Sequence, residues 1–284
     1  MVSGFNILQS STSDSNRQPQ IWAVLNLTPD SFYAGSRIGS DDFWRAAQAD
    51  LDLGADVLDL GAESTRPYSE PVSPDEQWAR LEVPLKILQD NLPTSDFVRR
   101  VSVDTTSVSV AERAIELGIR IINDVSAETD TDMLKTVAAA GGQYVTMHSG
   151  GSPQKMQVNP QYSDVVQEVF DKLKEKSDKA HEAGIKAENL ICDVGIGFGK
   201  TVEHNLALLR NISVFKKLGY RLLAGVSRKS FIGKILNLED PSERLNGSTV
   251  VHTYLALQGV DILRVHDVRQ ACEMRTLLRR LHHD

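Results

Sequence analysis

The sequence predicts an α/β protein folded as a single (β/α)8 TIM barrel, with its active site at the C-terminal ends of the strands. Three observations support this prediction. Short runs rich in Val, Ile and Leu alternate with longer amphipathic segments along the chain. The short runs number eight, which is the number of strand–helix units in such a barrel. Polar side chains follow each run, as they do at the catalytic rim of this fold.

The eight apolar runs are expected to form buried parallel strands, because strands covered on both faces are apolar almost without interruption. They span residues 21–27, 57–62, 101–104, 120–126, 143–148, 189–195, 221–227 and 261–267. A doubly wound open sheet would use the same alternation of strands and helices. The count of eight and the absence of a dinucleotide fingerprint favour the barrel.

The segments between the runs carry helix signals, so eight helices are expected. A capping box with Pro in the first turn begins at Ser73, and another possible box begins at Ser109. Apolar residues recur at helical spacing between Ser163 and Gly184. Six glycines before strands are interpreted as helix C-terminal caps: Gly54, Gly118, Gly142, Gly184, Gly219 and Gly259.

Composition excludes several classes of protein. The net charge of −7 argues against a nucleic-acid partner, and no apolar run approaches 18 residues, so no membrane span is expected. The Ser-rich start lacks the pattern of a signal peptide, and two cysteines make no disulfide framework. A cytoplasmic protein is expected. Its domains are a disordered tail over residues 1–20 and one barrel over residues 21–284.

The stretch CDVGIGFGKT, residues 192–201, has the composition of a nucleotide-binding loop but not its spacing. A P-loop would need a glycine where Val194 stands. The third glycine of a dinucleotide loop would fall at Lys200. Alternate glycines instead indicate a backbone that turns tightly or passes close to another group.

Each predicted strand ends in hydrogen-bonding or charged side chains. Singly, these residues have ordinary structural roles: Asp104 suits a helix cap, His148 a buried histidine, and Glu63 an ion pair with Arg66. All eight strand ends together indicate a polar pocket. The residues at these ends include Asn26, Glu63, Asp104, Asn123, Asp124, His148, Asp193, Ser227, Arg228, Lys229, Arg264, His266 and Asp267.

The pocket's chemistry suits an aromatic heterocycle joined to an anion. Cationic side chains, which bind phosphate or carboxylate, are Arg66, Lys229, Arg264 and His266. Acceptors for amino and ring N–H groups are Asp104, Asn123 and Asp193. Phe32 and Phe198 could close over an aromatic ring. No zinc motif, cysteine cluster, serine triad order or nucleophile elbow is evident.

Eight motifs in order together resemble the dihydropteroate synthase family, from about residue 21 to 282. They are LNLTPDSFYAG, GAESTRPYSEPVSPDEQ, VSVDTTSVSV, IINDVSA, YVTMHSGGSP, DVGIGFGKT, GVSRKSFIG and LRVHDV. The resemblance implies a transferase of folate biosynthesis. Such enzymes join 6-hydroxymethyl-7,8-dihydropterin pyrophosphate to para-aminobenzoate, releasing pyrophosphate. It also implies a Mg²⁺ cofactor and a homodimer that acts on small molecules.

The resemblance assigns roles by motif match. Asp104, Asn123 and Asp193 would hold the amino-pyrimidine edge of the pterin, Lys229 would bond its ring, and Arg264 would stack on it. Met147 and Arg66 would also contact substrate. Asn26, Arg264 and His266 would hold the pyrophosphate, with Mg²⁺ at Asn26. Thr65, Pro67, Ser227, Phe32 and Phe198 would shape the aminobenzoate site, and the glycine run would lie against the ligand. The residues implied as catalytic are Asp104, Lys229, Arg264 and His266.

The sequence departs from the family pattern in three places. One is Val194, which stands where the family's D-P-G has Pro. Tyr33 and Ala34 stand where the family's S-F-x-D-G-G places x and Asp, and the missing acid bears on loop closure and metal handling. His148-Ser149-Gly150-Gly151 replaces H-M-x-G. Two rival functions remain: a methyltetrahydrofolate-type methyltransferase on the same barrel, and a pterin-binding protein without catalysis. The SRK and RVHD motifs argue against the first, and the retained polar residues against the second.

Overall fold

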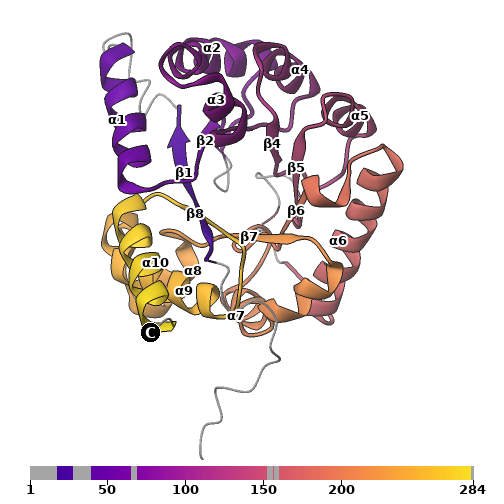
Figure 1. Ribbon diagram of the computed structural model, residues 1–284. Helices are drawn as coiled ribbons and strands as arrows, with labels where there is room; N and C mark the ends of the chain where they lie inside the picture. Colours follow the sequence, from indigo (N-terminus) through magenta and orange to yellow (C-terminus); the bar gives the residue numbers. More distant parts are fainter. Residues whose placement is uncertain (1–17, 28–39, 65–68, 152–155, 157–159, 283–284) are drawn as a thin grey trace, which may run out of the picture.

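The strands form a closed parallel barrel with the helices around it (Figure 1). The computed structural model describes residues 18–27, 40–64, 69–151, 156 and 160–282. Each strand pairs in parallel with the next, and the last closes against the first through pairs such as Trp22 with Arg264. The barrel prediction is confirmed, because a doubly wound sheet would leave two open edges.

All eight strands lie within two residues of their predicted bounds. They are β1 (Gln20–Asn26), β2 (Val57–Gly61), β3 (Val101–Asp104), β4 (Ile121–Asp124), β5 (Gln143–Met147), β6 (Leu190–Asp193), β7 (Arg221–Gly225) and β8 (Ile262–Val265).

The prediction of eight helices is wrong, because the described residues contain ten α-helices. The chain breaks its helix at Pro93 before β3, and at Asn237, in the left-handed region, after β7. The helices are α1 (Ser40–Leu53), α2 (Pro74–Asn91), α3 (Thr94–Arg100), α4 (Val108–Leu117), α5 (Thr131–Ala139), α6 (Val165–Glu182), α7 (Val202–Arg210), α8 (Ser230–Leu236), α9 (Leu245–Leu257) and α10 (Val268–His282). Three short 3-10 helices are η1 (Ala187–Asn189), η2 (Ile212–Leu218) and η3 (Pro241–Arg244).

The predicted helix ends are partly correct. Ser73 caps α2 by accepting the Glu76 N–H at 3.3 Å. The box at Ser109 is wrong, because Ser107 caps α4 and accepts the Val110 N–H at 3.4 Å. Five of the six predicted glycines take left-handed backbone angles; the exception is Gly142, whose place is taken by Gly141.

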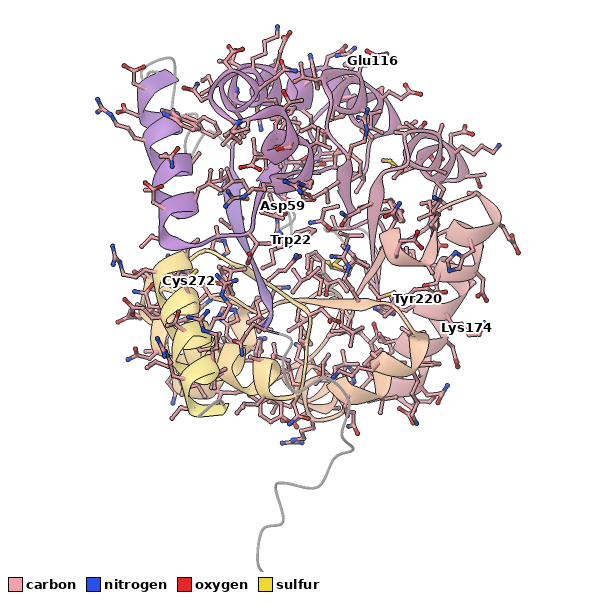
Figure 2. The ribbon with its side chains drawn as sticks, viewed as in Figure 1. Trp22, Asp59, Glu116, Lys174, Tyr220 and Cys272 are labelled. Atoms are coloured by element: carbon pink, nitrogen blue, oxygen red, sulfur yellow. The ribbon has the colours of Figure 1, made fainter. Side chains whose placement is uncertain are left out.

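Two apolar layers hold the barrel together. The larger layer lies between the strands and the helices. The smaller one fills the barrel and consists of Trp22, Val57, Ile121, Val145, Ile191, Leu223 and Ile262. Figure 2 shows Trp22 near the barrel centre, with Glu116 and Lys174 out on the helices. Since side chains alternate along a strand, the residue two positions after each member of the smaller layer also faces inward.

The described residues contain no helix long and apolar enough to cross a membrane. The predicted tail over residues 1–20 lies mostly outside the described residues, which begin at residue 18.

Candidate active site

Between its apolar inner layer and its C-terminal mouth, the barrel interior carries polar side chains. Two positions beyond the apolar inner layer, the inward residues are Val24, Asp59, Asn123, Met147, Asp193, Gly225 and Arg264. Asp104 faces the same interior from β3, because its Oδ2 lies 2.7 Å from the Arg264 guanidinium. The strands therefore gather four of the predicted polar residues, Asp104, Asn123, Asp193 and Arg264, at one mouth.

Arg264 lies between two carboxylates at this mouth. Its Nε is 2.6 Å from Asp59 Oδ2, and its second nitrogen donates to Asp104 at 2.7 Å. Asn123 donates its amide N–H to the same Asp59 oxygen at 3.1 Å. These bonds fix the plane of the guanidinium and the amide of Asn123, so three predicted site residues are held in one network.

The hydrogen bonds and ion pairs around Arg264 shift the pKa values of Arg264 and Asp104. Burial opposes charge on Arg264, but Asp59 and Asp104 outweigh it and raise the pKa of Arg264 above its ordinary value. Burial also raises the pKa of Asp104 to about 7; Arg264 lowers it, and Asp59 and Asp124 raise it. Burial thus opposes ionisation of Asp104, and its ion pair with Arg264 favours it.

The prediction from sequence missed Asp59, the central acceptor of this network. Its side chain is fully buried, and its Oδ1 has no hydrogen-bond partner among the described residues. Figure 2 shows it inside the ring of strands. The signal was present in the run VLDLGA, where one acid interrupts an otherwise apolar strand. A buried strand tolerates such an acid only where it is paired.

The expectation that Asp124 belongs to the rim with Asn123 is wrong. Successive residues of a strand point to opposite faces, so Asp124 faces the helices. It accepts the Tyr144 hydroxyl at 2.6 Å and the Ser126 N–H at 2.8 Å. Burial and then Asp124 raise the pKa of Tyr144 well above its usual value. Asp124 therefore joins β4 to β5 outside the site.

Asp193 and Lys229 form the other side of the mouth. The Gly195 N–H donates to Asp193 Oδ1 at 2.8 Å, and burial raises the pKa of Asp193. The Lys229 ammonium donates to the Ile196 carbonyl and lies 4.5 Å from the centre of the Phe198 ring. Burial lowers the pKa of Lys229 to about 8, although Asp193 raises it.

The glycine run after β6 packs against the protein's own backbone. A Cβ at Gly195 would meet the His148 carbonyl oxygen at 1.8 Å, and one at Gly199 would meet the Gly150 Cα at 2.6 Å. Both glycines also have left-handed backbone angles. The implied contact of this run with a ligand stays a prediction, because close approach to the loop after β5 already requires these glycines.

Ser227 and His266 are joined at the ends of β7 and β8. The His266 N–H donates to Ser227 Oγ at 3.2 Å, and the His266 side chain is exposed. Between Ser227 and Lys229, Arg228 has a left-handed backbone (φ 57°) and pairs with Asp267, its Nε 3.0 Å from Oδ2. This ion pair turns Arg228 toward Asp267.

Asn26 ends β1, level with Gly61 of β2, and is half-buried. The described residues contain no group of three or more acids, histidines and cysteines able to hold a metal. One neutral amide oxygen suits Mg²⁺, which keeps several waters and takes its remaining ligands from substrate phosphates. The residues present therefore fit a Mg²⁺ that arrives with a pyrophosphate.

Several predicted residues lie outside the described residues: Phe32, Thr65, Arg66 and Pro67, together with the departures Tyr33 and Ala34. The predicted ion pair of Glu63 with Arg66 stays a prediction, because Arg66 is one of these residues. Glu63 itself accepts the Val72 N–H at 3.1 Å and the Gln77 amide at 3.2 Å. It thus ties the segment after β2 to the start of α2.

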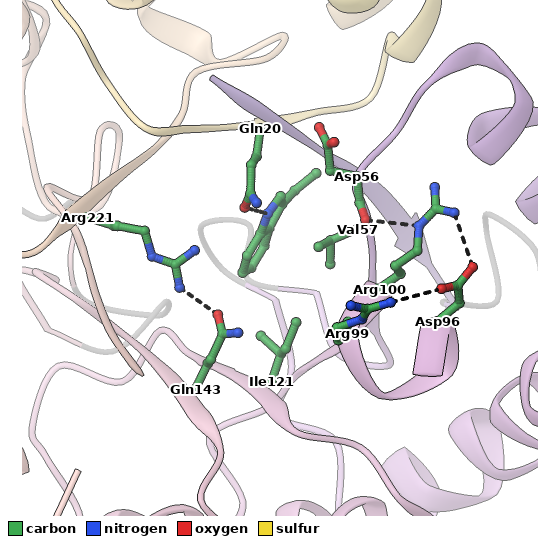
Figure 3. Close-up of a pocket in the computed structure, with 10 residues that line it drawn as sticks. Gln20, Asp56, Val57, Asp96, Arg99, Arg100, Ile121, Gln143 and Arg221 are labelled. Carbon is green, nitrogen blue, oxygen red and sulfur yellow. Dashed lines mark hydrogen bonds and ion pairs between the residues drawn. The ribbon is translucent and has the colours of Figure 1, made fainter. Parts of the chain in front are cut away.

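A hollow of about 280 Å³ lies at the opposite, N-terminal mouth, and no predicted site residue lines it (Figure 3). Arg221 donates to Gln143 at 2.6 Å, and Arg100 donates to the Ala55 carbonyl at 2.7 Å. Arg100 also lies 3.8 Å from Asp96. Hydrogen bonds and ion pairs of this kind at the N-terminal face are typical of barrel stability rather than catalysis.

Comparisons with known proteins agree with this geometry. A family model described as "Pterin binding enzyme" matches residues 22–266. The dihydropteroate synthase of Haemophilus influenzae is 38% identical over 262 residues, which are 90% of this chain and 91% of that protein.

Two solved structures have the same fold. One is the Thermus thermophilus dihydropteroate synthase in complex with 4-aminobenzoate, with a TM-score of 0.81 and 39% identity over 94% of this chain and 95% of that one. The other is the Yersinia pestis dihydropteroate synthase in a sulfonamide drug complex, with a TM-score of 0.85 and 33% identity over 93% of this chain and 94% of that one.

Proposed function

Since the chain belongs to the family of pterin-binding enzymes, and within it to the dihydropteroate synthases, we propose how its barrel mouth performs their reaction. The enzyme is a transferase. It joins 6-hydroxymethyl-7,8-dihydropterin pyrophosphate to para-aminobenzoate and yields 7,8-dihydropteroate and pyrophosphate. The observation that carries the proposed residue roles is Arg264 held between Asp59 and Asp104, with Asn123, Asp193 and Lys229 at the same mouth.

The pterin's amino-pyrimidine edge is proposed to lie against Asp104, Asn123 and Asp193. That edge presents N–H donors side by side, and a carboxylate accepts two of them at once. One Asp193 oxygen already takes the Gly195 N–H, which aims the carboxylate into the mouth. Lys229 donates to the ring, and the fixed guanidinium of Arg264 stacks on the ring face. Met147, fully buried on β5, supplies an apolar wall.

The pyrophosphate is proposed to lie between Asn26, Arg264 and His266. The exposed His266 and the permanently charged Arg264 stabilise the negative charge that grows as the pyrophosphate departs. Mg²⁺ would be held by Asn26 and the phosphate oxygens, and when bound it neutralises part of this charge.

The aminobenzoate is proposed to lie between Ser227 and Phe198, with Phe32, Thr65 and Pro67 from the segments after β1 and β2. The Phe198 ring beside the Lys229 ammonium offers an aromatic wall next to a positive charge. Para-aminobenzoate has an aromatic ring, which would pack on the Phe198 wall, and a carboxylate, which a nearby positive charge would attract.

In the reaction, the bond between the pterin CH2 and the pyrophosphate oxygen breaks, and a bond from the arylamine nitrogen to that CH2 forms. The pterin ring supplies electrons, so departure of the pyrophosphate before attack gives a pterin cation. Asp104 stabilises that cation when ionised. The amine is neutral at pH 7, and after its attack the new secondary amine gives up one proton to solvent. The segments after β1 and β2 would exclude water, which otherwise captures the cation.

The reaction is tested by pyrophosphate release from the purified protein, given the dihydropterin pyrophosphate and Mg²⁺, with and without para-aminobenzoate. We expect release that depends on the arylamine and yields dihydropteroate. Release without arylamine dependence would instead indicate hydrolysis. No product despite calorimetric binding of the pterin would favour one of the rivals, a methyl-transferring or a binding-only barrel.

We also propose that the protein is a homodimer, because three neighbouring helices expose large apolar side chains that a partner could cover. They are Ile235 and Leu236 on α8, Val250, Tyr254 and Leu257 on α9, and Leu277 and Leu281 on α10. Residence in the cytoplasm is proposed as well, since the cysteines at 192 and 272 are unpaired thiols.

Val250→Glu is expected to dissociate the dimer, because it places a charge among the apolar side chains of α9. We expect the dissociation constant to rise by about 100-fold or more in sedimentation equilibrium. Val83→Glu is the matched control, because Val83 is a similarly exposed apolar residue (55% exposed, against 68% for Val250) on α2, away from this surface. A monomeric wild-type protein, or equal dissociation by both variants, would contradict the proposed interface.

A further inference from the structure

Lys200, at the end of the glycine run, is a buried lysine that the proposed mechanism does not use. Only 3% of it is exposed. Its ammonium donates to the Gly195 carbonyl at 2.8 Å and the Phe198 carbonyl at 3.0 Å, and it lies 2.9 Å from His148 Nδ1. A fourth, longer contact joins the ammonium to the His148 carbonyl at 3.5 Å, so its three N–H donors are all used.

These contacts join two loop segments that α6, η1 and β6 separate in the chain. Gly195 and Phe198 belong to the segment after β6, and His148 follows β5. The two segments touch through backbone as well, since the glycine positions 195 and 199 leave no room for a Cβ. Lys200 therefore fixes the path of the chain that carries the Phe198 ring.

The surroundings of Lys200 explain how a buried ammonium is tolerated there. A buried charge is tolerated only when hydrogen bonds replace water, and here carbonyl oxygens and a ring nitrogen replace it. Among the ion pairs of the described residues none involves Lys200. Burial, and then Lys229, lower its pKa well below the usual value. Burial and then Lys200 lower the pKa of His148 to about 3, which favours a neutral ring. Because a lysine ammonium can only donate, its 2.9 Å contact assigns the acceptor role to Nδ1.

We propose that Lys200 is a positioning residue that holds Phe198 against Lys229 and so forms the arylamine side of the site. This inference rests on the proposed function, because it assigns the arylamine to Phe198. Asp193 keeps its own support from the Gly195 N–H, and its carbonyl accepts the His148 N–H at 3.1 Å. Loss of Lys200 should therefore affect the arylamine more than the pterin.

The test is Lys200→Met, which matches the aliphatic part of the lysine side chain and removes its terminal N–H donors. We expect the KM for para-aminobenzoate to rise by about tenfold or more, since hydrogen bonds from a charged donor are lost. The dissociation constant of dihydropterin pyrophosphate, measured by calorimetry, should change by less than about threefold. An unchanged KM for the arylamine, in a variant that folds and turns over, would overturn the proposal.

Lys176→Met is the matched control, because Lys176 is also a buried lysine (1% exposed) bound to two carbonyls, those of Ser126 and Met147, each at 2.7 Å. It does not touch the segment after β6. We expect the control to lose stability while the KM for the arylamine stays near that of the wild type. Equal increases of that KM in both variants would show a merely structural effect and overturn the proposal.

Nitrogen NMR of the wild-type histidines tests the contact between the Lys200 ammonium and His148 Nδ1, called here the Lys200–His148 bridge. The His148 ring, assigned by the signal lost in His148→Gln, should stay neutral down to about pH 4 with Nδ1 as acceptor. Titration near pH 6.5 would overturn the bridge. If the wild type shows no synthase activity, the proposed function fails. An active wild type whose His148 titrates near pH 6.5 contradicts only the proposed role of Lys200.

Discussion

Arg264→Met is expected to lower kcat/KM by about a thousandfold or more, because it removes a charge proposed to hold both the pterin and the departing pyrophosphate. It should also destabilise the fold by about 3–5 kcal/mol, since Asp59 would lose the partner that compensates its buried charge. The two effects are measured by steady-state kinetics and by urea unfolding.

The double variant Arg264→Met/Asp59→Leu separates these effects. With no buried charge left at position 59, stability should recover most of its loss, because replacing a buried ion pair by apolar groups is often neutral. Activity should stay lost. Recovery of activity in the double variant would show that Arg264 acts only by compensating Asp59, and near-normal activity in Arg264→Met would remove it from the mechanism altogether.

Asp193→Asn is expected to weaken binding of dihydropterin pyrophosphate by about 100-fold in calorimetry. The amide keeps the shape and can still accept the Gly195 N–H, which is 2.8 Å from Oδ1 in the wild type. It offers one acceptor fewer and no charge to the donor edge of the pterin, a loss of roughly 2–3 kcal/mol.

Asp124→Asn is the control, because Asp124 is also a buried acid at the end of a strand but faces the helices. It should lose about 1–3 kcal/mol of stability through its bond to Tyr144 and leave pterin affinity unchanged. Equal affinities for wild type and Asp193→Asn would exclude Asp193 from pterin recognition.

The fold class and the positions of the strands were predictable from sequence because their signals are local. A buried parallel strand is a short apolar run, and a turn or helix end is a glycine or a capping hydroxyl, whatever the rest of the chain does. The errors lay where two local signals competed. Ser107 and Ser109 both offer a hydroxyl two residues apart, and only the packed helix decides that Ser107 is the cap.

Recognition of the polar rim also came from sequence, since parallel strands bring their C-terminal ends to one mouth. The sequence did not show which side of its strand each residue faces. Asn123 and Asp124 are neighbours in the chain, yet the first faces the barrel interior and the second faces the helices. The direction depends on where the barrel axis lies, and no short segment contains that information.

The sequence alone thus determined the barrel, the family and most of the residues at the mouth. The tertiary structure alone decided that Arg264 meets Asp59, 205 residues earlier in the chain. It alone showed that the glycine run packs on the loop after β5, and that Lys200 bridges the two. The physical reason is that closing the ring of strands creates contacts between distant segments, and buried charges choose their partners only within that closed interior.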